Sequence, residues 1–82
     1  MGLMNLRIGV DCRFAENGTV RVRRIKMGKS WIGVGQGRQW QDGNGRHLLI
    51  MLPNHNSREI VLRPDTLIWE LLPESGTRHQ LA

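Results

Sequence analysis

The sequence is poor in residues that cross-link or anchor a small protein. Its 82 residues include one cysteine, one phenylalanine and no tyrosine. Because Cys12 has no second cysteine, an intrachain disulfide is excluded, which fits a reducing, cytoplasmic compartment. The longest apolar run, Leu48–Pro53, is far shorter than the ~20 residues that span a bilayer. Met1–Arg7 lacks the features of a signal peptide. We therefore expect a cytoplasmic protein that does not enter a membrane.

Motifs for catalysis and cofactor binding are also missing. Gly28–Ser30 resembles the end of a P-loop, but that motif needs a glycine where Arg23 stands. The glycines of Gly33–Gly37 lack the third glycine of a dinucleotide fingerprint, because Arg38 occupies its position. The three histidines are far apart, Cys12 is alone, and no carboxylate pair or nucleophile elbow is visible. The sequence therefore predicts no enzyme, no metal site and no cofactor.

What the chain does contain is alternation of apolar and polar residues. Leu6–Phe14 alternates strictly, which is typical of a half-buried strand. The sequence Asn17-Gly18 then favours a hairpin turn. In the strand that follows, the apolar phase slips by one residue at Arg23–Arg24. A slip of one residue predicts a β-bulge at that point.

Further strand patterns follow at short intervals and cover Ser30–Gln36, Arg46–Leu52, Arg58–Arg63 and Leu67–Leu72. No segment has a convincing helical period. The pattern predicts an all-β fold, a small antiparallel barrel of five or six short strands that is SH3-like or, alternatively, OB-like. We expect residues 1–72 to form one domain and residues 73–82 to form a disordered tail. The predicted core consists of Ile8, Val10, Phe14, Val22, Trp31, Leu49, Leu62 and Trp69.

Two of the predicted strands are apolar on both faces. A lone antiparallel sheet normally alternates between an apolar inner face and a polar outer face. A second apolar face therefore favours a non-enzymatic interaction module that forms a homodimer or binds a protein partner. The side chains expected on this contact surface are Leu48, Ile50, Leu52, Ile68 and Leu72. The alternative explanation is a strongly bent strand that packs inward at both ends.

Positive charge predominates, with 12 Lys and Arg against 7 Asp and Glu and a net charge of +5. Arginine suits phosphate because its planar group donates paired hydrogen bonds, so the alternative function is weak, nonspecific binding of single-stranded RNA or DNA. The residues predicted to form this surface are Arg21, Arg23, Arg24, Lys26, Arg38, Trp40 and Arg46. The competing interpretation is that these arginines are merely solvated.

Overall fold

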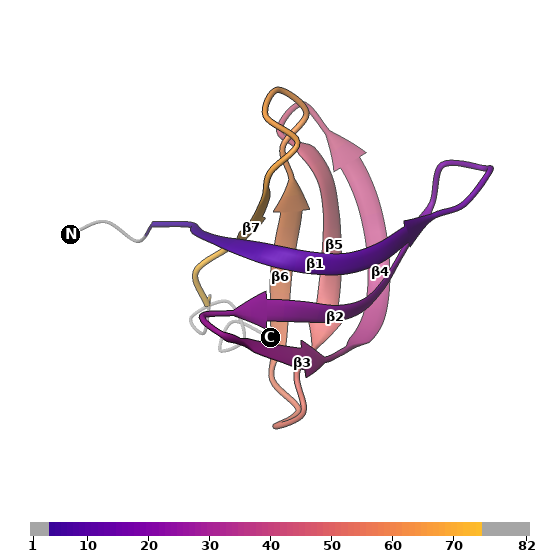
Figure 1. The fold of residues 1–82 in the computed structure, drawn as a ribbon. Helices are drawn as coiled ribbons and strands as arrows, with labels where there is room; N and C mark the ends of the chain where they lie inside the picture. Colours follow the sequence, from indigo (N-terminus) through magenta and orange to yellow (C-terminus); the bar gives the residue numbers. More distant parts are fainter. Residues whose placement is uncertain (1–3, 75–82) are drawn as a thin grey trace, which may run out of the picture.

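In the computed structural model, which describes residues 4–74, the chain forms one curled antiparallel sheet (Figure 1). The strands are β1 (Leu6–Phe14), β2 (Val20–Met27), β3 (Ser30–Gly33), β4 (Gly35–Asp42), β5 (Gly45–Met51), β6 (Ser57–Leu62) and β7 (Trp69–Leu71). Their order in the sheet is β3-β2-β1-β7-β6-β5-β4. Of the tail predicted for residues 73–82, residues 75–82 lie outside the described residues. Residues 4–74 contain no helix with the length and apolarity to cross a membrane.

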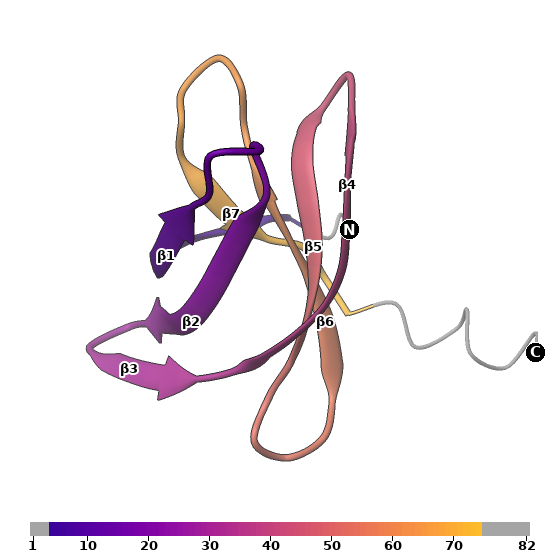
Figure 2. The same cartoon turned by 90° about the vertical axis from the view of Figure 1, so that its right-hand side faces the viewer.

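The sheet curls because its two outermost strands follow each other directly in the chain. Only Val34 separates β3 from β4, and its backbone N–H donates to the carbonyl of Arg23 over 3.1 Å. Figure 2 shows β4, β5 and β6 lying across from the β1–β3 layer. The predicted all-β, barrel-like architecture is confirmed. The number of strands is seven rather than five or six, because the strand predicted for Ser30–Gln36 ends at Gly33 and a separate strand, Gly35–Asp42, begins after Val34.

The predicted bulge in β2 is confirmed. Asp11 pairs with Arg24 and Cys12 pairs with Val22, which leaves Arg23 as the extra residue. The bulge allows Val22 and Ile25 to point into the same core although they are an odd number of residues apart. Arg23 and Arg24 are both exposed as a result.

The core lies on the concave face of the sheet and comprises Val20, Val22, Ile25, Leu48, Ile50, Ile60 and Leu71. Of the predicted core residues, Val22 is buried and Ile8, Val10 and Trp69 pack partly against the core. Phe14 and Trp31 were predicted wrongly, because they are 58% and 45% exposed. Leu49 and Leu62, which were also predicted, are half-buried and are not part of the core cluster. Phe14 is the last residue of β1, beside the hairpin, where little of the sheet covers it.

The predicted orientation of β5 was also wrong. Leu48 and Ile50, expected on an outer contact surface, are 0% and 1% exposed, and Leu52 packs against the same core. The reason is pairing: Leu48 lies opposite Ile60 of β6, so both belong to the concave face. Ile68 and Leu72, the remaining residues expected on that surface, are half-buried and lie just outside β7, one at each of its ends.

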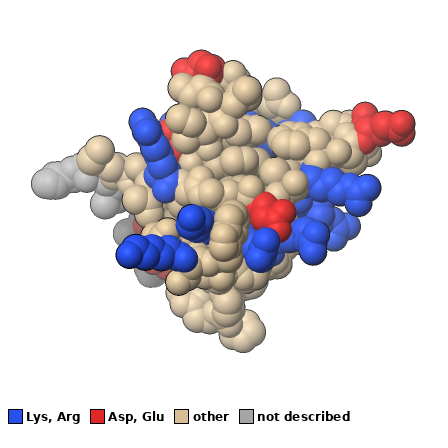
Figure 3. Space-filling view, in the orientation of Figure 1, with Lys and Arg blue, Asp and Glu red and all other residues tan. Residues whose placement is uncertain are grey.

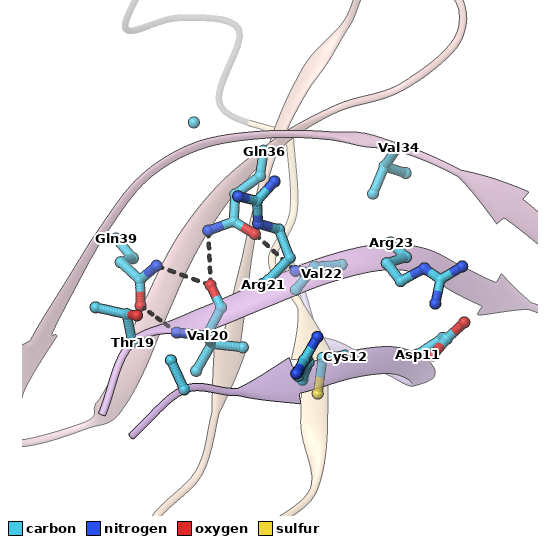
Figure 4. Close-up of a pocket in the computed structure, with 13 residues that line it drawn as sticks. Asp11, Cys12, Thr19, Val20, Arg21, Val22, Arg23, Val34, Gln36 and Gln39 are labelled. Carbon is cyan, nitrogen blue, oxygen red and sulfur yellow. Dashed lines mark hydrogen bonds between the residues drawn. The ribbon is translucent and has the colours of Figure 1, made fainter. Parts of the chain in front are cut away.

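Two glutamines of β4 close the curled sheet against the N-terminal half of β2 (Figure 4). The backbone N–H of Val22 donates to Gln36 Oε1 over 2.6 Å, and the N–H of Val20 donates to Gln39 Oε1 over 3.0 Å. Both glutamine Nε2 atoms donate to the carbonyl of Val20 over 2.8 Å. Side-chain amides therefore take the place of a backbone ladder between these strands.

Candidate nucleic-acid interface

The convex face of β1 and β2 is rich in positive charge. Because Val20, Val22 and Ile25 point into the core, the residues that alternate with them point outward. Figure 3 shows Lys and Arg side chains over this side of the molecule, with a cluster below the β1–β2 hairpin. The exposed basic residues that these two strands supply are Arg7, Arg13, Arg21, Arg23, Arg24 and Lys26.

An exposed tryptophan lies on the same face. Trp31 of β3 pairs with Lys26 of β2, which places its side chain on the convex side of the sheet. The Arg24 guanidinium lies 5.0 Å from the centroid of the indole ring, and the Lys26 ammonium lies 6.0 Å from it. Cation–π attraction of this kind holds the ring against the two cations, and the Trp31 side chain is still 45% exposed. The face therefore presents one large aromatic surface between two cations.

Gly9 of β1 provides the space into which the indole ring extends. Gly9 pairs with Lys26, and Lys26 pairs with Trp31, so these three residues lie in one row across the sheet. A Cβ at position 9 would lie 3.6 Å from the Cη2 atom of Trp31 and 3.2 Å from the Cβ of Lys26. The absence of a side chain at Gly9 lets the ring reach across β2 toward β1.

The structure brings together only part of the predicted nucleic-acid surface. Arg21, Arg24 and Lys26 share the convex side of β2 with Trp31, and Arg23, the extra residue of the bulge, is exposed beside them. Trp40 lies on the opposite side of β4 from the bridging Gln39, where it stacks on His47 and Arg38 lies 5.1 Å over its ring. Arg46 donates over 3.0 Å to the carbonyl of Gly18 in the β1–β2 hairpin.

His47 anchors this second aromatic cluster. Its Nδ1 lies 2.7 Å from Glu59 Oε2, and its Nε2 lies 2.8 Å from Asp42 Oδ1. A neutral imidazole can donate to only one of the two carboxylates, and the tautomer decides which ring nitrogen donates. Hydrogen bonds to its carboxylate, first from the backbone N–H of Asn44 and second from the His47 side chain, lower the pKa of Asp42. Because His47 is 6% exposed under the parallel ring of Trp40, the cluster fits a structural role.

Other reactive groups are few among residues 4–74. No group of three or more His, Cys, Asp and Glu side chains there is arranged to hold a metal ion. In the Asp42–His47–Glu59 cluster the carboxylates lie on different ring nitrogens and do not converge on one point. Burial, and secondarily the Asp11 carboxylate, raises the pKa of the Cys12 thiol, which keeps it neutral at neutral pH.

The chain matches no protein-family model, no curated protein and no solved structure.

Proposed function

We propose that the protein binds single-stranded RNA or DNA, without sequence preference, through the convex face of β1–β3. The observation that carries this proposal is the 45% exposed Trp31, seated over Gly9 and flanked by Arg24 and Lys26. An unpaired base stacked on such a ring contributes ~1–3 kcal/mol, and every base offers a π-face. The surrounding arginines supply contacts to phosphate.

The same evidence makes self-association the weaker proposal. Three of the five residues expected on a contact surface face the core, so the apolar patch that suggested a homodimer is smaller than the sequence implied. As a finer description of the fold we propose an SH3-like barrel in which β3 and β4 act as one bent strand. Barrels of this size, including OB-folds, bind oligonucleotides on strand faces, although fold alone does not decide function.

The test is fluorescence anisotropy of a labelled ten-nucleotide oligouridine at low salt. Trp31→Ala should weaken binding roughly 5- to 100-fold, which corresponds to one missing stacking interaction. Trp31→Phe should restore most of the affinity because it keeps an aromatic face. Since Trp31 is exposed, both variants should melt close to the wild type.

A matched pair of charge variants locates the surface. Lys26→Gln, beside Trp31, should weaken binding more than Arg38→Gln, which removes the same charge beside Trp40. The proposal is wrong if the wild type does not bind at low salt or if Trp31→Ala binds as tightly as the wild type.

A further inference from the structure

A solvent-open groove of about 1080 Å³ lies between the N-terminal half of β2 and β4 (Figure 4). Gln36 and Gln39 line it from β4, and Arg13, Arg21 and Arg23 line it from β1 and β2. Trp31 and its flanking cations are not among its lining residues. The groove is therefore a separate feature, located toward the hairpin end of the same strands.

The arginines of this groove have no counter-ion in the part of the chain that the structure describes. Arg13 lies directly opposite Arg21 in the β1–β2 pairing, and like charges in that position destabilise a sheet. The neighbouring pair, Asp11 and Arg24, has opposite charges and forms a 3.0 Å ion pair. Within residues 4–74, no carboxylate forms an ion pair with Arg13, Arg21 or Arg23. Among residues 4–74, the fold thus places three arginines without a carboxylate partner around one groove.

The wall formed by β4 adds neutral hydrogen-bond donors. Gln36 and Gln39 each use one Nε2 hydrogen on the carbonyl of Val20, and a primary amide carries a second hydrogen. The one carboxylate that lines the groove, Asp11, is already paired with Arg24. A groove lined by positive charge and by amide groups that carry N–H donors complements an oxyanion. Arginine favours phosphate among oxyanions because it can donate two parallel hydrogen bonds.

We propose that this groove is a phosphate-binding site. The inference rests on the proposed function in one respect: the phosphate it takes is the phosphodiester of the strand whose base stacks on Trp31. Bound phosphate screens Arg13 from Arg21, so the two arginines destabilise the free protein and stabilise the complex.

Two variants should therefore have opposite effects on folding and on binding. Arg13→Gln and Arg21→Gln should each raise the melting temperature of the free protein by roughly 1–8 °C, because they remove the repulsion. Each should also make the slope of log affinity against log salt for oligouridine shallower, by about 0.7 for every phosphate that the variant no longer neutralises. The matched control is Arg7→Gln on β1, whose cross-strand neighbour is the acidic Glu70, and it should not raise the melting temperature.

The source of the phosphate is distinguished by melting the protein in sodium phosphate, in sodium chloride of equal ionic strength, and with oligouridine. We expect phosphate and oligouridine to raise the wild-type melting temperature more than that of Arg13→Gln/Arg21→Gln. If oligouridine binds through Trp31 but neither arginine changes the salt slope, the groove inference is wrong and the proposed function stands. If only inorganic phosphate raises the melting temperature, and only with both arginines, the site stands and the proposed function fails. If neither ligand raises the melting temperature in a way that depends on the two arginines, the groove is not a phosphate-binding site.

Discussion

At the scale of single residues, exposure to water decides which side chains hold this fold together. Ile50 is 1% exposed in the core, whereas Phe14 is 58% exposed at the end of β1. Truncating Ile50 to alanine should lower the free energy of unfolding by about 2–5 kcal/mol, because a cavity remains. Phe14→Ala should lower it by less than about 1 kcal/mol, as is usual for exposed positions. Urea unfolding of the two variants measures both values.

The reverse ranking would show that the inner and outer faces are assigned wrongly. Leu67→Ala is a suitable control, because Leu67 is 71% exposed and lies outside the strands. It should unfold at the same urea concentration as the wild type.

Gly9 carries the second prediction at this scale. In Gly9→Val the added methyl groups would occupy the space into which Trp31 extends, since even a Cβ there lies 3.6 Å from the ring. We expect oligouridine affinity to fall toward that of Trp31→Ala, while the fold persists because valine favours strands. Anisotropy and circular dichroism measure the two effects. Unchanged affinity in a folded Gly9→Val protein would mean that the position of the ring is not important for binding.

At the scale of strands, hydrophobic periodicity predicted the strands whose inner faces are apolar. It missed most of β4, whose inner face is polar. β1 was predicted with its observed bounds, and the bulge at Arg23 followed from a slip in phase. β4 gave no signal, because its inner face carries Gln36 and Gln39, which bond to β2 instead of filling the core. Hydrogen bonds between distant side chains and backbone leave no period in the sequence.

Trp31 could have been placed correctly from the sequence by counting across its turn. Met27 pairs with Ser30, so the two-residue turn between them sets Ile25 opposite Ile32 and Lys26 opposite Trp31. That register puts Ile32 inside and Trp31 outside. Residue type alone favoured a buried tryptophan. The separation of Trp40 from the β2 arginines depends on β4, and it could not be predicted without that strand.

The glutamine closure gives a prediction for β4. Removing both amides in Gln36→Ala/Gln39→Ala leaves the N–H groups of Val20 and Val22 to water, and each missing hydrogen bond costs about 0.5–1.5 kcal/mol. Amide hydrogen exchange at Val20 and Val22 should become faster relative to Ile25, which β1 and β3 hold on both sides. Gln41→Ala, on the same strand, is the control. Equal protection in the double variant and the wild type would contradict this closure.

At the scale of the whole molecule, carboxylates determine how stability depends on pH. Hydrogen bonds from the Asn44 N–H and His47 lower the pKa of Asp42, and those from Asn5 and Arg63 lower the pKa of Glu70. The carboxyl groups of Asp42 and Glu70 therefore bind a proton more tightly in the unfolded chain than in the folded chain. Their stabilising effect is present above the ordinary carboxyl pKa values of 3.8 and 4.5 and is lost as pH falls through the lowered values. The urea midpoint should decline below about pH 4.5.

Asp42→Asn and Glu70→Gln test the origin of that decline. Each variant removes one titrating group, so its urea midpoint should fall less steeply between about pH 5 and about pH 2.5 than that of the wild type. If both variants follow the wild-type curve, other groups cause the acid sensitivity.

Binding of nucleic acid over Trp31 can be followed through the three indole N–H signals in a ¹H–¹⁵N correlation spectrum. Each signal is assigned by a single Trp→Phe variant, and oligouridine is then added at low salt. Trp31 lies on the convex face of β3, Trp40 stacks on His47, and Trp69 packs against the core. We predict that the Trp31 signal shifts in proportion to bound oligouridine while those of Trp40 and Trp69 stay in place. A shift confined to Trp40, or no shift in any of the three signals, would show that nucleic acid does not bind over Trp31.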